Sequence, residues 1–217
     1  MKKVIIMFIF VFIGTLVFSQ NGEWQKNQIK FSPFRMINMF NPGLEIGYQK
    51  NYGQFASQIS IAYLTNINIF GAGNNRKNIN GYRVIFEEKI LLSKTVRRNN
   101  RLFISSEIGY NNVSLTIENR RFVPFNTEEF YIGGCNLKRQ SGYFGTKMNM
   151  EFRINHLILE WYAGFGIIYQ YVQHFNKRNA TDRMDFNFED LISPLFEEEG
   201  RYLIPYFPIT VKIGYAF

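Results

Sequence analysis

The sequence contains a single cysteine, Cys135, and only two histidines, His156 and His174, among its 217 residues. One cysteine excludes a disulfide within the chain, and we expect Cys135 to be an inert thiol in a loop. These three side chains are far apart in the sequence and do not have the spacing of a metal site. We therefore expect neither a metal nor any other cofactor.

Signatures of catalysis and of nucleic-acid binding are also missing. There is no Gly-x-Ser-x-Gly stretch, and basic residues do not alternate with aromatic residues that could stack on bases. An enzyme could draw on His174 with Asp185, Asp190 and Ser193, but their spacing does not enforce a contact between a nucleophile and a base. We predict no enzymatic activity and no nucleic-acid partner. A lipid-modifying hydrolase or acyltransferase remains the alternative.

Long hydrophobic runs are absent after the start of the chain. The apolar run 4–18 follows the basic Met1-Lys2-Lys3 and ends at the small residue Ser19. It is shorter than the roughly 20 residues that a helix needs to cross a bilayer, and its layout is typical of a secretory signal peptide. We predict a signal peptide at 1–19 and a single domain at 20–217. The lack of later runs excludes a helical membrane protein.

Aromatic residues are abundant, at 18% of the chain, and they lie in short stretches in which apolar and polar residues alternate. In the last stretch, 207–217, every second residue is apolar, which is the period of a β-strand with one apolar face. Aromatic residues at both ends of such a face are typical of a strand that spans a membrane. Eight stretches follow this pattern: 29–34, 43–50, 55–64, 82–92, 102–110, 144–154, 157–171 and 207–217.

The connections between these stretches alternate in length. Short turns on one side and long loops on the other are typical of outer-membrane barrels. The sequence therefore predicts an all-β fold, an antiparallel up-and-down eight-stranded transmembrane β-barrel with both termini in the periplasm. Val113 and Leu115 would extend the strand that ends at Tyr110 only through a one-residue bulge. The expected short turns are 51–53, 94–100 and 155–156, and the expected long loops are 65–81, 111–140 and 173–206.

The two faces of the predicted strands differ in size and charge. The apolar face is too bulky for the narrow interior of an eight-stranded barrel, whereas the face with small and charged residues fits there. A soluble barrel, which is the alternative, would have the opposite sidedness. Buried charges persist when they are paired, so five acids and five bases predict a neutral interior plug, with a narrow solute channel as another alternative. The predicted interior network is Glu45, Arg83, Glu87, Lys89, Glu107, Lys147, Glu151, Arg153, Glu160 and Lys212.

The end of the chain, Lys212-Ile-Gly-Tyr-Ala-Phe217, looks like that of small outer-membrane barrels of Gram-negative bacteria, of the OmpX and OmpA-transmembrane kind. The stretches 29–34 and 41–48 are similar to the opening of an uncharacterised family of such barrels. The resemblance implies an outer-membrane location and no particular activity. It also implies the barrel-assembly machinery as a partner during biogenesis, with Gly214, Tyr215 and Phe217 as the assembly signal, although Gly214 sits closer to the terminus than in the commonest form of that signal.

The long loops carry basic residues that could contact lipopolysaccharide. Arginine pairs with phosphate in a two-pronged manner, and the net charge of +8 suits either anionic headgroups or an ordinary solvated surface. We expect a structural or surface-interaction role through the extracellular loops, with outer-membrane lipid and lipopolysaccharide as partners. No oligomeric state follows from these patterns. The candidate lipopolysaccharide contacts are Arg76, Lys77, Arg120, Arg121, Arg178 and Arg183.

Overall fold

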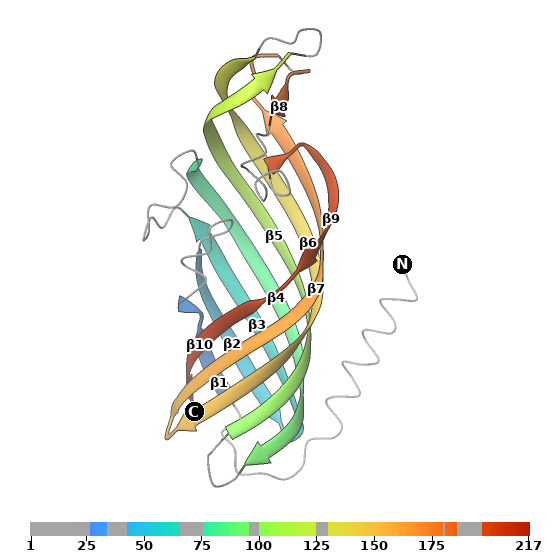
Figure 1. Cartoon of the computed structure of the whole chain (residues 1–217). Coiled ribbons are helices and arrows are strands. Elements are labelled where there is room, and N and C mark those ends of the chain that lie inside the picture. The colour runs from blue at the N-terminus through green and yellow to red at the C-terminus, as the bar shows by residue number, and fades with distance from the viewer. Residues whose placement is uncertain are drawn as a thin grey trace, which may run out of the picture.

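The computed structural model of the chain is an antiparallel β-sheet that closes into a ring (Figure 1). It describes residues 27–33, 43–65, 76–95, 100–124, 130–179, 181–185 and 197–217. The predicted signal peptide lies outside these residues. The strands are β1 (Asn27–Phe31), β2 (Gly43–Tyr52), β3 (Phe55–Thr65), β4 (Arg76–Thr95), β5 (Asn100–Val123), β6 (Tyr131–Ile154), β7 (Leu157–Phe175), β8 (Arg183–Asp185), β9 (Gly200–Tyr206) and β10 (Ile209–Ala216).

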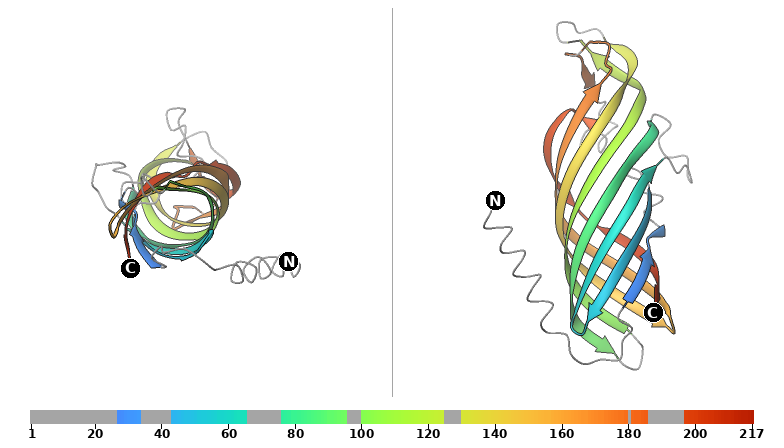
Figure 2. Two further views of the ribbon diagram at one scale, coloured as in Figure 1. Left: turned by 90° about the horizontal axis from the view of Figure 1, so that it is seen from below. Right: turned by 180° about the vertical axis from the view of Figure 1, so that it is seen from behind.

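The ring closes where the first strand meets the last. β1 to β7 pair in sequence order, and β10 pairs with both β7 and β1. At this seam, the Phe217 amide donates to the Asn27 carbonyl at 2.9 Å, and the Asn27 amide donates to the Phe217 carbonyl at 3.3 Å. Both ends of the barrel domain therefore lie at the same rim. The view along the ring in Figure 2 shows the strands surrounding a central space.

β7 is paired along one side by two strands in succession. β10 pairs with residues 157–163 of β7, and β9 pairs with residues 166–172. The break between them falls at Pro208, which has no amide hydrogen to give to the ladder, although its carbonyl accepts from the Gly164 amide at 3.0 Å. The loop expected at 173–206 is therefore wrong over Gly200–Tyr206, which forms β9. Among the described strands, the short strand β8 pairs with β5, outside the ring order.

The described connections at one rim are short. Gly53, with a φ of 70°, lies in the turn between β2 and β3, and Asn155, with a φ of 56°, lies in the turn between β6 and β7. Glycine and asparagine adopt this left-handed backbone most readily. The predicted alternation of connections holds, but the expected loop at 111–140 is wrong, because β5 reaches Val123 and β6 begins at Tyr131.

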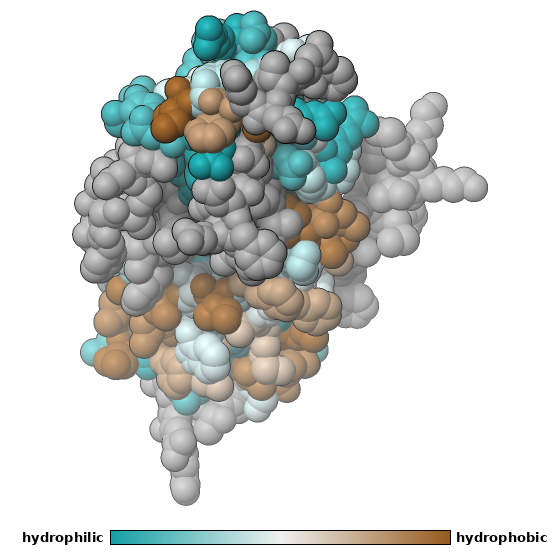
Figure 3. Space-filling model, turned by 45° about the horizontal axis from the view of Figure 1, so that its top comes forward, coloured by the Kyte–Doolittle hydropathy of each residue, from teal (hydrophilic) through white to brown (hydrophobic). Residues whose placement is uncertain are grey.

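The predicted sidedness of the wall is confirmed. Ile213, Phe165 and Met148 are 44%, 68% and 54% exposed, whereas Lys212 and Glu151 are only 2% and 4% exposed. Apolar side chains therefore face outward and charged side chains face inward. Figure 3 shows the same division on one face, where brown apolar residues cover the wall and teal hydrophilic residues gather toward the end with the long loops. In the part of the chain that the structure describes, no helix is long and apolar enough to cross a membrane.

The upper part of the ring holds an apolar core that was not predicted. Val113 and Leu115 continue β5 with no register shift against β6, so the expected bulge is wrong, and both side chains face inward. Their outward neighbours Asn112 and Ser114 are polar. This part of the wall therefore has apolar residues inside and polar residues outside, as in a protein whose surface is exposed to water. The core consists of Ala62, Leu64, Ile79, Val113, Leu115, Ile117, Phe122, Cys135, Leu137, Val172 and Met184.

Cys135 belongs to this core. It lies within β6 and is 3% exposed, so its expected position in a loop is wrong. Burial raises the pKa of the Cys135 thiol to about 11, because a thiolate loses its hydration there. The thiol is therefore protonated at neutral pH, and its reactivity is low.

Candidate functional site

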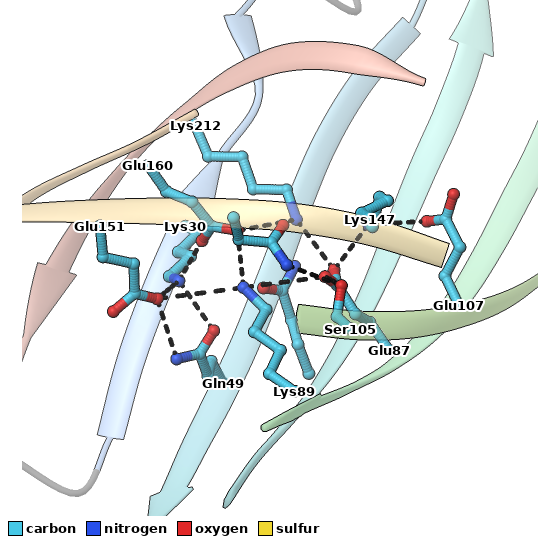
Figure 4. A network of polar contacts seen from close by, with 12 residues as sticks. Lys30, Gln49, Glu87, Lys89, Ser105, Glu107, Lys147, Glu151, Glu160 and Lys212 are labelled. Carbon is cyan, nitrogen blue, oxygen red and sulfur yellow. Dashed lines mark hydrogen bonds and ion pairs between the residues drawn. The ribbon is translucent and has the colours of Figure 1, made fainter. Parts of the chain in front are cut away.

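The candidate site is a cluster of buried charges in the lower half of the ring (Figure 4). Four lysines and four glutamates contribute to it, and each is at most 4% exposed. They come from β1, β4, β5, β6, β7 and β10, so almost the whole circumference takes part. Alternation along each strand places these side chains inside, since their neighbours in sequence face outward. The interior charge cluster is Lys30, Glu87, Lys89, Glu107, Lys147, Glu151, Glu160 and Lys212.

One half of the cluster is built around Glu160. Lys30 contacts both Glu160 and Glu151, with 2.5 Å between its Nζ and Glu151 Oε1. Lys89 Nζ lies 2.6 Å from Glu160 Oε1, and Lys30 also donates to Gln49 at 2.7 Å. Two lysines thus share the Glu160 carboxylate. Lys30 also donates to Glu151 and Gln49, whereas the other carboxylates near Lys89 lie 3.9 Å from its Nζ.

The other half is built around Glu87. Lys147 Nζ lies 2.9 Å from Glu87 Oε2 and 2.8 Å from Glu107 Oε2. Lys212 Nζ approaches Glu87 Oε2 at 3.3 Å, and the Ser105 hydroxyl donates to Glu87 Oε1 at 2.7 Å. Lys212 also lies 4.0 Å from the carboxylate of Glu160, which joins the two halves.

These ion pairs cross the interior of the ring. Lys89 on β4 reaches Glu160 on β7, and Glu87 on β4 reaches Lys212 on β10, although neither pair of strands is adjacent in the sheet. The eight side chains carry four positive and four negative charges, and the buried Arg101, which pairs with Glu151 in the ladder, adds one positive charge beside them. Buried charges remain ionised when they are paired in this way. The cluster therefore occupies the lumen at this level and ties opposite walls together.

Tyr162 covers the cluster from within the ring. It is fully buried, and the Nζ atoms of Lys147 and Lys212 lie 4.1 Å and 4.9 Å from its ring centroid. At these distances the face of the ring attracts both ammonium groups. The aromatic ring thus contributes to holding the two lysines away from water.

Seven of the ten residues predicted for the interior network lie in the cluster. Glu45 and Arg83 are buried elsewhere, as a separate pair with 3.6 Å between Oε2 and Nη1, and Arg83 Nε donates to Asn111 at 2.8 Å. The prediction for Arg153 is wrong. This residue is half-buried at the lower rim, where its Nε donates to the Asn155 carbonyl at 2.5 Å. Arg153 stands two residues before Asn155, where the turn to β7 begins, so its side chain reaches the turn and not the cluster.

Lys30 is the member that the sequence prediction missed. It is 1% exposed and contacts two carboxylates. The signal was present, because Lys30 stands between the outward-facing Ile29 and Phe31. The short first strand, broken by Pro33, obscured the alternation.

A second buried cluster lies nearer the long loops. The Glu197 carboxylate is 1% exposed and accepts from Arg76 Nε at 2.6 Å and from Arg120 Nη2 at 3.0 Å. The Glu197 carbonyl lies 2.6 Å from His174 Nε2. Arg76 and Arg120, two of the expected lipopolysaccharide contacts, are thus both engaged by a buried carboxylate.

The other predicted lipopolysaccharide contacts lie on the surface or are half-buried. Lys77 pairs with Glu118 at 2.5 Å. Arg121 lies over the Phe130 ring, 4.1 Å from its centroid, and Arg178 lies 5.5 Å from the centroid of Tyr131. Arg178 and Arg183 are exposed. Arg121 lies on β5 and Arg183 on β8, and these two strands pair with each other. Arg178 is connected to β6 through its contact with the Tyr131 ring.

His174, the candidate catalytic base, is buried at the end of β7. It is 8% exposed, and burial lowers the pKa of its imidazole, so the ring is neutral at pH 7. Its Nε2 is occupied by the Glu197 carbonyl. The proposed partners Asp190 and Ser193, and the side chain of Asp185, lie outside the described residues.

Asp182 anchors the base of the last long loop. Its carboxylate accepts from the Tyr131 hydroxyl at 2.7 Å and from the Asn179 amide at 3.1 Å. The hydrogen bond from Tyr131 lowers the pKa of Asp182, because it favours the ionised carboxylate. Among the described residues, no group of histidine, cysteine and acidic side chains has the geometry to hold a metal ion.

No protein-family model matches the sequence, and no curated protein matches it either. Among solved structures, the chain is similar to a major outer membrane protein from Thermus thermophilus. The TM-score is 0.43 and the sequence identity is 10%, over 90% of this chain and 100% of that one. A similarity of this size does not assign the chain to a family.

Proposed function

We propose that the chain is a non-enzymatic outer-membrane β-barrel, exported by a cleaved signal peptide, whose lumen is closed by the interior charge cluster. Its role is structural or lies in surface interactions of its outer loops. We count β9 and β10 as two parts of one wall strand, which gives eight strands around the ring. That count is also the one implied by the resemblance of the chain to small barrels of Gram-negative bacteria.

The observation that carries this proposal is the exposed apolar wall. Large side chains such as Ile46, Ile61 and Leu203 are 59%, 56% and 68% exposed. A soluble protein seldom leaves so continuous an apolar surface in water, whereas hydrocarbon stabilises it. A closed ring also pairs the backbone groups that lipid cannot satisfy.

Aromatic residues support a position for the membrane. Tyr63 and Tyr82 pair across β3 and β4, and the Tyr82 ring lies 6.2 Å from that of Tyr110. Near the other rim, Tyr48 and Tyr215 flank Ile29 in the ladder. Tyrosine favours the two interfaces of a bilayer. On β5, the apolar outward face covers residues 102–110, which agrees with the roughly 9–11 residues of a membrane-spanning strand.

We expect the folded protein to sit in the outer-membrane fraction and to conduct no ions. Its gel mobility should change on heating, as it does for closed barrels, and planar bilayers containing it should show no stable open level, because paired charges cross the lumen. The control is Glu118→Gln, which removes only an exposed ion pair outside the lumen. Its gel mobility and conductance should equal those of the wild type. A soluble fraction with no heat-dependent shift would contradict the membrane barrel. A shift accompanied by steady conductance would instead retain the barrel and favour the solute channel.

We also propose that Lys77, Arg121, Arg178 and Arg183 contact lipopolysaccharide phosphates. Replacing the three arginines with serine should reduce co-purified lipopolysaccharide several-fold, because each guanidinium can hold a phosphate through two hydrogen bonds. The measurement is lipopolysaccharide per mole of folded protein after detergent extraction. Arg153→Ser, at the opposite rim, is the matched control. Equal amounts in the triple variant and the wild type would refute this role.

A further inference from the structure

A polar hollow lies on the outer side of the wall, above the apolar band that includes residues 102–110 of β5. Its volume of about 350 Å³ lies in the range of small-molecule sites. Leu115 and Leu137 reach it only with their backbone, because their side chains pack in the apolar core. We call this feature the polar hollow. The side chains that line it are Asn78, Ser114, Thr116, Asn136, Lys138 and Phe175.

The register of the sheet places the polar hollow outside the proposed bilayer. Tyr110 ends the apolar outward stretch of β5, and Tyr169 lies at the same level of β7, since both pair with a common neighbour, Gly142. Ser114 and Thr116 follow Tyr110 by about 13–20 Å along the strand. At a strand tilt of about 40°, the hollow is about 10–15 Å above the band, whereas the headgroup layer is only about 5–8 Å thick. The hollow therefore faces the layer beyond the lipid headgroups.

A bulge in β4 borders the polar hollow. β4 has one residue more than β5 between Lys77 and Asn80. Within it, Asn78 has a left-handed backbone with a φ of 53°, which asparagine adopts more readily than most residues. As a result Ile79 packs in the apolar core, while the exposed Asn78 lines the hollow. The bulge thus adds an amide group to the lining.

Neutral hydrogen-bonding groups make up most of the lining. Thr116 and Asn136 pair in the ladder, and the Thr116 hydroxyl donates to Asn136 Oδ1 at 3.2 Å. This contact orients the Asn136 amide and leaves its two N–H groups to donate to another acceptor. Ser114 adds an exposed hydroxyl, and Asn78 adds a second amide. Together these groups can donate and accept, as the hydroxyl groups of a sugar require.

One aromatic ring and one cation complete the polar hollow. Phe175 pairs with Asn136 in the ladder and is 45% exposed, so its ring can pack on the C–H face of a pyranose. Lys138 is half-buried and has no ion-pair or aromatic partner among the described residues. Arg178 and Arg201, by contrast, each lie 5.5 Å from the centroid of a tyrosine ring. The Lys138 ammonium group is therefore the one in the hollow that attracts an acidic group.

We infer that the polar hollow binds an acidic saccharide. The sugar ring lies against Phe175, its hydroxyls exchange hydrogen bonds with Asn136 and Ser114, and its carboxylate or phosphate pairs with Lys138. The inference deepens the proposed function and rests on the membrane placement of the wall. Acidic saccharides occur in the lipopolysaccharide of the same membrane and in soluble glycans outside the cell, and the chemistry of the hollow suits both sources.

The first arm of the test uses NMR titration of the folded full chain in a detergent without a sugar headgroup. Glucuronic acid should bind about tenfold more tightly than glucuronamide, which has the same ring but no charge. Lys138→Met should remove this preference, and Ser114→Phe, which fills the hollow, should weaken binding of both sugars. Lys50→Met, which removes an exposed lysine near the opposite rim, is the matched control and should equal the wild type.

The second arm distinguishes the two sources. The folded chain is mixed with lipopolysaccharide that retains its acidic inner sugars or with lipid A alone, and native mass spectrometry measures the amount retained. A preference for the former that Lys138→Met removes assigns the ligand to lipopolysaccharide. A preference in the first arm alone assigns it to a soluble glycan.

The inference is overturned if neither arm shows a preference that depends on Lys138. The heat-dependent gel shift of the wild type and of each variant is measured in parallel. A wild type that lacks the shift would refute the membrane barrel, whereas a shifted wild type without either preference would refute only the saccharide site.

Discussion

Replacing Glu160 with glutamine is expected to lower the free energy of unfolding by about 3–5 kcal/mol, the range found when one partner of a buried ion pair is removed. The carboxylate is fully buried and neutralises Lys30 and Lys89, with Lys212 at 4.0 Å. In the variant, three ammonium groups remain close together with one fewer negative charge. Urea unfolding in lipid vesicles, followed by the fluorescence of the adjacent Trp161, measures the difference.

Two further variants make this expectation specific. Glu118→Gln removes a carboxylate that pairs with Lys77 on the surface, and such exposed pairs contribute only about 0–1 kcal/mol. Combining Glu160→Gln with Lys89→Gln should recover much of the loss, because the charge balance is restored. A single Glu160→Gln variant as stable as Glu118→Gln would show that the interior charge cluster does not stabilise the barrel.

Deleting Phe217 is expected to reduce folded barrel in the membrane by about tenfold, because the short seam loses two backbone hydrogen bonds at its end and unpaired backbone groups are unfavourable in a membrane. The residue supplies both backbone hydrogen bonds to Asn27 at the seam. The resemblance to small outer-membrane barrels also makes it part of the signal read by the assembly machinery. Quantifying the heat-shifted band in membrane fractions measures the effect.

The substitution Phe217→Ala separates these two contributions. It keeps the backbone pairing with Asn27 and removes only the aromatic ring, so any loss of membrane-inserted protein reports recognition of the side chain. Arg183→Ser, in a segment far from the seam, serves as the loop control and should assemble normally. Normal membrane levels of the Phe217 deletion would refute the importance of both the seam and the terminal residue.

The strand pattern of the apolar outer wall follows from the sequence. Strict alternation in 144–154 and 207–217 determines which side chains face outward, because a strand cannot shift by one residue without placing Lys147 or Lys212 on the apolar outer face. Seven members of the interior charge cluster followed from the same alternation. Lys30 was missed although the signal was present, since the strand around it spans only five residues.

Above the apolar band, the interpretation of the same alternation is wrong. Val113 and Leu115 were expected to face outward, as apolar residues do lower on the wall, and so to require a bulge. The structure keeps the register and turns them inward, where they pack with Leu137 in the apolar core. Alternation gives the spacing of the two faces but does not say which one meets lipid, water or the interior.

By itself, therefore, the sequence determined the period of the strands within the apolar band, which depends on neighbours along the chain, and their sidedness, which depends on the size and charge of the side chains. Only the tertiary structure decided which charges meet across the lumen, that Glu197 engages Arg76 and Arg120, and that Asn136 and Phe175 meet at the polar hollow. These contacts join residues from different strands. Their geometry depends on ring closure and on the register between strands, which no local pattern in the chain specifies.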